Sequence, residues 1–450
     1  MTSPVILDVA AYFTTLAPPE WFAERLPEHG PGSRRGIYSW AVVTWLMIVQ
    51  RLHPKSTLQA ALEHLFVCWP TRLLIPCKRV REQRISGHPG GYCQARQRMP
   101  IEIINQVSDQ ILAQLQAALP DRPPHGDRPI YLLDGSSLEL EHAPGLVAAY
   151  PPAENQFGQT HWPILRIAVM HNLANGLALR PAWGPMYGAN AVSEQTLAAE
   201  LLTRLPTGSI VVGDRNFGIF STAYAAQQRG HDVVLRLTKD RFHRLTGAAG
   251  YGGQDQSVTW LPSHHVRTAH PQLAPTAVLH GRVIVAQLQS AKTSELIYLF
   301  TTLALPAEQV LEIYSDRWYV ETDLRSLKTT VHLQQLKARS PAMMEKELVM
   351  AITAYNLVRA VMGWAAQQTK IEPRCLSFSQ VQNVVEATLP ILLAAPTPQA
   401  YALAFDRMIE RATTYCRLPT RTAHRSFPRL VWGHNRTFPK RKLLSVKKTI

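Results

Sequence analysis

The stretch 128–237 constrains the fold most, because segments with the periodicity of strands and of helices alternate along it. Strand-like apolar segments are expected at 130–133, 164–170, 177–183, 209–212 and 233–237, and helical segments at 194–205 and 220–229. Ser193 is a suitable N-cap for the first helix, and a turn at 172–176 joins the second and third strands. Three strands followed by helix, strand, helix and strand are typical of an α/β sheet with helices packed against it.

Helical periodicity dominates both flanks of this region. Apolar residues recur at intervals of three and four at 38–52, 58–66 and 101–119. After Pro306, helices are expected to continue to about residue 414. We therefore predict a helical N-terminal region at 1–120, a sheet core at 121–375 and a helical, basic C-terminal region at 376–450.

The segment 239–295 interrupts the regular pattern of the core. It is rich in Gly, His, Thr and Gln, and only 257–261 and 277–288 are strand-like. Regular structure resumes with a strand expected at 296–302. The expected fold class is thus α/β (or α+β), a mixed sheet core with helices on both faces, interrupted by a β-rich insertion.

The charge balance indicates a polyanionic partner. Lys and Arg exceed Asp and Glu by fifteen (47 − 32), which favours nucleic acid first and anionic membranes second. Residues 417–450 carry ten Lys or Arg and no acid, and residues 71–100 carry seven with a single acid, Glu82. Either run alone is equally compatible with an ordinary solvated surface.

No export or membrane-spanning segment is expected. The first basic residue is Arg25, so the charged start of a secretory signal is missing. The most apolar stretch, 40–49, is about half as long as a spanning helix and is interpreted as a buried core helix. Five cysteines without a CxxC pair suit reduced thiols in the cytoplasm. The spacing of Cys68, Cys77 and Cys93 lacks the paired ligands of zinc modules.

The most specific pattern lies at 314–328. Four residues follow one another at steps of three, four and seven, namely Tyr314, Arg317, Glu321 and Lys328. An α-helix turns by about 100° per residue, so on a continuous helix these residues fall within about 60° of one another. They therefore share one narrow helix face.

Glu321 is the only carboxylate on that face. Arg325 joins it, whereas Asp316 and Asp323 fall on the opposite side. One acid among cations and a tyrosine suits a metal-binding carboxylate flanked by groups that bind phosphate. By geometry alone, a helix face with ordinary ion pairs fits the same pattern.

Asp134 and Asp214 each stand at or just past the end of a short apolar strand. Three clustered carboxylates repel one another unless a cation neutralises them, and Mg²⁺ or Mn²⁺ prefers such oxygen ligands. Two ions about 3.5–4 Å apart support phosphodiester cleavage and transfer. A single Asp in such a position is more often a turn or cap residue, so the combination with Glu321 carries the prediction.

These motifs resemble one family, the bacterial insertion-sequence transposases of family four, which belong to the DDE group with a ribonuclease-H-like core. The resemblance is carried by the Y-R-E-K spacing at 314–328, by Asp134-Gly-Ser and by Gly213-Asp214-Arg-Asn-Phe217. It extends over about 86–442 through Gln94-Ala-Arg-Gln-Arg-Met-Pro100, Pro306-Ala-Glu, Ala354-Tyr-Asn-Leu-Val-Arg359 and Ser426-Phe-Pro-Arg429. It implies metal-dependent strand cleavage and transfer at transposon ends, through a hairpin intermediate.

The resemblance also implies roles for individual residues. It assigns two Mg²⁺ (or Mn²⁺) ions to the carboxylates of Asp134, Asp214 and Glu321. It assigns DNA phosphates to Tyr314, Arg317 and Lys328, with Arg325 on the same face. Two aromatic residues, Trp260 and Trp318, are candidates for stacking on a flipped base, although either could equally belong to the core.

The partners implied are the terminal inverted repeats of a transposon and its target DNA, bound by a homodimer in a synaptic complex. The N-terminal region is then expected to bind DNA, and the protein to associate with the nucleoid in the cytoplasm.

Two other functions remain open from the sequence. A catalytically inactive DNA-binding regulator derived from a transposase would keep the basic runs, but the intact set of three acids argues against decay. A metal-independent carboxylate hydrolase such as a glycosidase would use two acids, but the basic surroundings of Glu321 do not suit a neutral sugar.

Overall fold

The computed structural model describes residues 17, 19–25, 37–53, 55, 57–69, 73–74, 77–119, 125–156, 158–289 and 294–418. The basic tail singled out in the sequence lies outside these residues from position 419 onward, including the segment 426–429. The described residues up to Arg417 belong to one compact unit. The division at residues 120 and 375 therefore stays a prediction.

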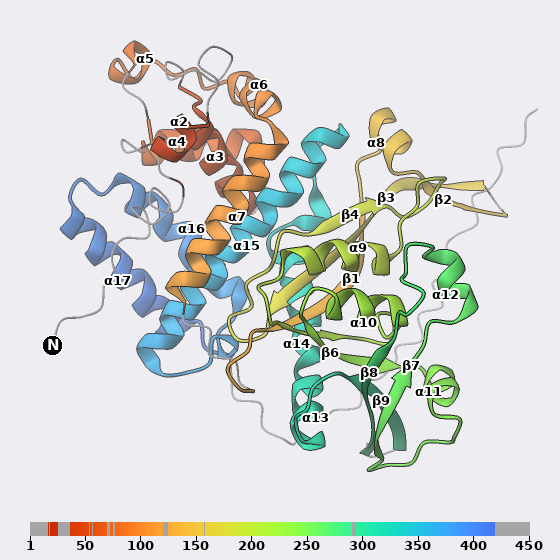
Figure 1. Ribbon diagram of the computed structural model, residues 1–450. Helices are drawn as coiled ribbons and strands as arrows, with labels where there is room; N and C mark the ends of the chain where they lie inside the picture. The colour runs from red at the N-terminus through yellow and green to blue at the C-terminus, as the bar shows by residue number, and fades with distance from the viewer. Residues whose placement is uncertain are drawn as a thin grey trace, which may run out of the picture. The chain divides into compact units, whose positions relative to one another are not determined.

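A mixed β-sheet organises the central region (Figure 1). Its strands are β1 (Ile130–Glu139), β2 (Pro152–Asn155), β3 (Gly158–Asn172), β4 (Ala182–Pro185), β5 (Ile210–Gly213), β6 (Asp232–Leu237), β7 (Asp255–Trp260), β8 (Leu279–Gln289) and β9 (Ser294–Thr301). The order across the sheet is β2-β3-β1-β5-β6-β9-β8-β7, with β4 paired to β3. Strands β1, β5 and β6 run parallel, and the other pairs are antiparallel.

Helices cover both faces of this sheet, as predicted. The core helices are α9 (Glu194–Leu201), α10 (Phe220–Gln227), α13 (Ala307–Ser315) and α14 (Tyr319–Arg325). Because side chains alternate along a strand, Leu133 of β1 packs with the apolar residues of α9 and α10, whereas Leu132 packs with those of α13 and α14. Figure 1 shows α9 and α10 lying across the strands.

The long helix α15 (Pro341–Thr369) is the centre of the helical region. It packs against α3 (Trp40–Leu52), α7 (Ile101–Ala118), α16 (Phe378–Ala394) and α17 (Pro398–Tyr415). By length and composition α15 could span a membrane, but 89% of its apolar window is buried inside the protein. Every residue of α3 is buried, which confirms the core helix predicted at 40–49.

The remaining helices are short or peripheral. They are α2 (Pro19–Ala23), α4 (Leu58–Cys68), α5 (Lys78–Arg81), α6 (Gly90–Arg98), α8 (Pro144–Ala149), α11 (Lys239–Thr246) and α12 (His264–Ala269). A buried ion group joins three parts of the helical region, because Glu347 of α15 bonds Arg51 of α3 at 2.9 Å and Arg96 of α6 at 3.1 Å.

The predicted insertion at 239–295 holds helices as well as strands. It contains two helices, α11 and α12, as well as β7 and β8. Strand β8 pairs with β9, which pairs with β6, so the insertion extends the central sheet. Helix α11 follows from a Thr238 N-cap, whose hydroxyl accepts a hydrogen bond from the Arg241 N–H.

The stretch after Pro306 is helical, as predicted, but the motif at 314–328 does not lie on one continuous helix. Helix α13 is followed by a 3₁₀ turn (Asp316–Trp318), then by α14 and a π-helical turn (Ser326–Thr330). The hydroxyls of Thr322, Ser326 and Thr329 each bond a carbonyl oxygen three or four residues back. Such bonds compete with the regular helix ladder and bend helices, which accounts for the irregular path.

Candidate active site

The two predicted aspartates lie beside each other on paired parallel strands. Leu133 of β1 is opposite Gly213 of β5, so Asp134, the next residue of β1, lies beside Asp214, the first residue after β5. Two positions before them, Leu132 and Val212 pack with residues of α13 and α14, and the alternation of the pleat directs the aspartate side chains to that same face. The expectation that Asp134 ends its strand is wrong, since β1 continues to Glu139 because it pairs with β3 as far as Ile164.

Burial raises the pKa of Asp134 to about 6. A hydrogen bond of 2.8 Å from the Gly135 N–H opposes this rise in pKa, and repulsion from Asp214 adds to it. Glu194 repels Asp134 as well, whereas Arg317 attracts it. The ionised pair is therefore costly without a cation beside it.

The loop after β5 fixes the side chain of Asp214 by a local turn. The backbone N–H of Asn216 donates to the Asp214 carboxylate at 2.8 Å. The backbone N–H of Phe217 donates to the Asp214 carbonyl oxygen at 3.1 Å, and the Phe217 ring is buried. This side-chain turn is characteristic of aspartate before a helix.

Glu321 lies on α14, and its carboxylate is bonded to a cation of the preceding turn. Arg317 Nη2 donates to Glu321 Oε1 at 3.1 Å. Burial disfavours the charge of Arg317, but its attraction to Tyr314, Glu321 and Asp134 outweighs burial and raises the Arg317 pKa. Arg317 therefore interacts with both the third acid and the first.

The three acids are not arranged as a complete set of metal ligands in this structure. Within the described ranges, no three His, Cys, Asp or Glu side chains are grouped so that they could hold a metal ion. Asp134 and Asp214 are adjacent, whereas Glu321 is paired with Arg317. The oxygen donors present are nevertheless the type that Mg²⁺ and Mn²⁺ prefer.

The other members of the predicted face turn toward the aspartates despite the broken helix. Tyr314 is buried, which raises its pKa, and it interacts with Arg317, Arg236 and Asp214. Burial lowers the pKa of Lys328, and attraction to Asp134 opposes that shift. Arg325 is exposed.

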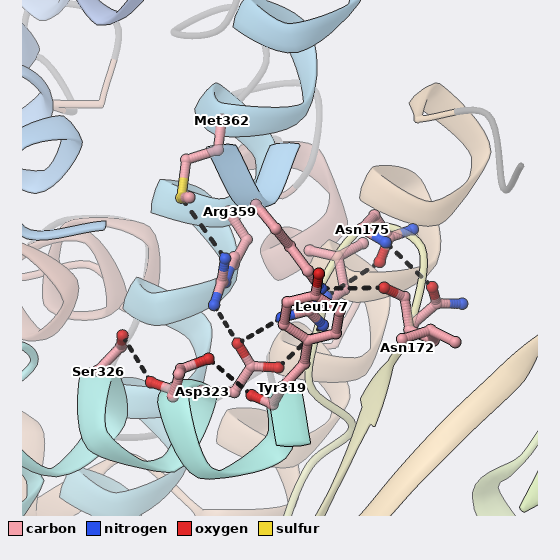
Figure 2. A network of polar contacts seen from close by, with 12 residues as sticks. Asn172, Asn175, Leu177, Tyr319, Asp323, Ser326, Arg359 and Met362 are labelled. Atoms are coloured by element: carbon pink, nitrogen blue, oxygen red, sulfur yellow. Dashed lines mark hydrogen bonds and ion pairs between the residues drawn. The ribbon is translucent and has the colours of Figure 1, made fainter. Parts of the chain in front are cut away.

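Asp323, two residues after Glu321, faces the opposite side and anchors α14 (Figure 2). Its fully buried carboxylate accepts hydrogen bonds from Arg359, and from both terminal nitrogens of Arg374 at 3.0 Å. Burial raises the Asp323 pKa, but the two arginines outweigh burial and hold that pKa below its usual value. Asp323 was predicted to lie opposite the cationic face, and the structure confirms this.

The Asp323 network reaches across three elements. Arg359 of α15 donates to the Tyr355 hydroxyl at 2.8 Å, and that hydroxyl donates to the Gly176 carbonyl at 3.0 Å. Figure 2 shows the network between α14, α15 and the turn that holds Asn172 and Asn175. Helical spacing predicted that Asp323 lies on the side of the helix opposite Glu321. It did not reveal the partners of Asp323, since they lie 36 and 51 positions away in the sequence.

The two tryptophan candidates have different surroundings. Trp260 of β7 is half-buried, and its ring meets Phe300 edge-on at 4.9 Å and Phe220 at 6.0 Å. It lines a cavity of about 640 Å³ together with Arg241 and Arg244. Trp318 is 51% exposed, next to Arg317.

The match to known proteins centres on the same region. Residues 125–357, which are 233 of 450, match the family model described as "Transposase DDE domain", and this span holds all the predicted site residues. The chain belongs to the transposase DDE domain family. Over 425 residues it is 25% identical to "Transposase InsG for insertion sequence element IS4" of Escherichia coli (strain K12), covering 92% of this chain and 90% of that protein. The resemblance to insertion-sequence family four is thereby confirmed.

Proposed function

We propose that the protein is an active DNA transposase that cleaves and joins strands at transposon ends with divalent metal ions held by Asp134, Asp214 and Glu321. The observation that carries the proposal is the register of β1 and β5, which sets Asp134 and Asp214 side by side on the face covered by α14. Glu321 is on that helix. Family membership supports the reaction class.

The donor set fits Mg²⁺ or Mn²⁺. The raised pKa of Asp134 reflects a buried carboxylate beside a second one, and a divalent cation would relieve both burial and repulsion. Bound ions would supply Lewis acidity on the two sides of the reacting phosphorus. Glu321 would join them by exchanging its bond to Arg317, whose charge then becomes available to a phosphate oxygen.

The chain's own cations would orient the DNA backbone. Arg317 and Lys328 both interact with Asp134, so a phosphate bound by them would lie next to the carboxylates. The Tyr314 hydroxyl can donate one further hydrogen bond. Arg325, which is exposed, would contact the backbone farther from the cleavage point.

The expected partners follow from the proposed reaction. They are the terminal inverted repeats and the target DNA, held by a homodimer that brings two ends together near the nucleoid in the cytoplasm. The helical N-terminal region would contribute to DNA binding. Trp260, which lines its cavity together with Arg241 and Arg244, and the exposed Trp318 remain the two candidates for stacking on a flipped base.

The test is cleavage of the element's own end DNA with Mg²⁺. We expect the wild type to cut, Glu321→Gln to bind the DNA equally well without cutting, and a chelator to abolish cutting. Glu308→Gln, the same change at an exposed position on α13, should cut like the wild type. Cutting by Glu321→Gln at the wild-type rate would disprove the assigned role of Glu321.

One observation favours a second function, that of a catalytically inactive DNA-binding regulator. The Glu321 carboxylate is bonded to Arg317 rather than grouped with the aspartates. If this arrangement persists on DNA, the protein would bind transposon ends without cutting them. The same experiment decides, because a regulator would leave the end DNA intact at every Mg²⁺ concentration.

A further inference from the structure

Two residues at the start of α9 form hydrogen bonds to the loop that carries Asp214. We call these hydrogen bonds, which join Glu194 and Gln195 to Asn216, the clasp. We infer that Glu194 and Gln195 are positioning residues, which hold Asp214 beside Asp134 through their hydrogen bonds to Asn216. This inference rests on the proposed function of the carboxylates. It also gives a role to Gly135 and Asn216, which follow the acids of the two motifs by one and two positions.

The side-chain amide of Asn216 is held at both ends. Its Nδ2 donates to Glu194 Oε2, and its Oδ1 accepts a hydrogen bond from Gln195 Nε2 at 2.7 Å. Gln195 Nε2 also lies 3.0 Å from the Asn216 carbonyl oxygen. Since the Asn216 N–H donates to the Asp214 carboxylate, the clasp fixes the turn that aims Asp214.

Glu194 also lies against the strand that carries Asp134. A Cβ atom at Gly135 would stand 2.2 Å from Glu194 Cδ, so a side chain at this position would displace the carboxylate. The Gly135 N–H in turn bonds Asp134 at 2.8 Å. One side chain therefore contacts the segment after each aspartate, 80 positions apart in the chain.

The position of Glu194 is itself fixed by its neighbours. The Ser193 hydroxyl caps α9, accepting a hydrogen bond from the Thr196 N–H at 3.1 Å. Arg166 of β3 attracts the Glu194 carboxylate and donates to the Val192 carbonyl at 2.7 Å. The start of α9 is thus held to the sheet before it meets Asn216.

The hydrogen bonds of the clasp, rather than the charge of Glu194, would serve the site. A third negative charge near Asp134 and Asp214 adds repulsion to a pair that already repels. Without the clasp, the two aspartates would be free to move apart. A glutamine at position 194 keeps an oxygen that accepts from Asn216 Nδ2, so it should preserve the geometry.

The test compares metal binding and cutting by the full-length protein on end DNA. Binding of Mn²⁺ is followed by the paramagnetic resonance signal of the free ion, and cutting is followed against Mg²⁺ concentration. We expect Glu194→Ala to weaken Mn²⁺ binding about tenfold or more, in the range found for residues that orient metal ligands, and to raise the Mg²⁺ requirement in parallel. Glu194→Gln should stay within about twofold of the wild type, with DNA binding unchanged in both variants.

A matched control is Glu200→Ala, which removes the same group from the other end of α9, where it pairs with Arg204. It should bind Mn²⁺ like the wild type. Gln195→Ala removes only the hydrogen bonds from Gln195 to Asn216. This variant replaces Glu194→Ala in the test if Glu194→Ala does not fold. Gly135→Ala should displace Glu194, so its effect and that of Glu194→Ala should be less than additive.

The inference is overturned if Glu194→Ala and Gln195→Ala bind Mn²⁺ like the wild type. It is also overturned if Glu194→Gln is as defective as Glu194→Ala, because the charge would then matter rather than the hydrogen bond. A wild type that binds Mn²⁺ but never cuts would count against the proposed function alone, and the Mn²⁺ affinities of the variants would still decide the inference.

Discussion

The pKa of Asp134 makes the stability of the metal-free protein depend on pH. The ordinary value of 3.8 is raised to about 6 in the folded chain, chiefly by burial. The folded state therefore binds more protons than the unfolded state between about pH 4 and pH 6. The contribution of this carboxyl to stability is largest below pH 4 and is lost as the pH rises through 6.

Asp134→Asn should accordingly stabilise the metal-free protein at pH 7, by about 1 to 3 kcal/mol. The gain should vanish near pH 4, where the wild-type carboxyl is protonated. Unfolding in urea at the two pH values measures it, with the exposed Asp127→Asn as the control. Mg²⁺ should stabilise the wild type and not Asp134→Asn. Equal stability of wild type and Asp134→Asn at pH 7 would contradict the raised pKa of Asp134.

Arg317 and Arg325 offer a comparison of two arginines in one segment. Arg317 is half-buried against Glu321 and interacts with Asp134, whereas Arg325 is exposed. We expect Arg317→Ala to slow end cleavage about 100-fold or more, as loss of a group at a developing charge does. Arg325→Ala should weaken DNA binding only modestly. Single-turnover cleavage rates measure both, and equal losses would refute the distinction.

At the scale of elements, the buried Asp323 group determines how firmly α14 is held. Removing one partner leaves buried charges without compensation, so Asp323→Ala should destabilise the protein by about 3–5 kcal/mol. Chemical denaturation measures this change. The exposed Asp406→Ala of α17 should have little effect. A loss below about 1 kcal/mol would mean that the network does not anchor α14.

Much of the element pattern could be predicted because it depends on local periodicity. Short apolar segments were enough to predict the strands at 130–133, 209–212 and 233–237. The Ser193 cap could be predicted from its hydroxyl group. The third strand of the meander is divided, since 177–183 contributes a single bridge at Ala178 before β4 begins. The breaks in the helical stretch after Pro306 were not predicted. The hydroxyl-to-carbonyl hydrogen bonds that accompany them do not change the periodicity of apolar residues in the sequence.

The candidate site was predictable in part for the same reason. Helical spacing predicted a shared face for Tyr314, Arg317 and Lys328, and in the structure each of the three interacts with Asp134 or Asp214. The clasp of Asn216 by Glu194 was not visible, because it joins segments whose proximity depends on the whole sheet. The pairing of Glu321 with Arg317 is a local contact that the spacing of four residues allowed but did not demand.

At the scale of the whole molecule, the basic tail should govern salt-dependent DNA binding. Replacing Lys440, Arg441 and Lys442 by Gln should lower the slope of log K against log salt by up to about 2.7, if each cation meets a phosphate. Binding titrations at several salt concentrations measure this slope. Thermal unfolding of the variant should match the wild type. An unchanged slope would show that these residues do not contact DNA.

The order of the chain has a consequence for synthesis on the ribosome. Asp134 lies on β1 and Asp214 directly after the neighbouring strand β5, and both precede α14 in the chain by more than 100 residues. A growing polypeptide therefore holds two acids long before Glu321 has been translated. Under the proposed function, an unfinished product released anywhere before that codon would lack the third metal-binding acid and should therefore not cut DNA.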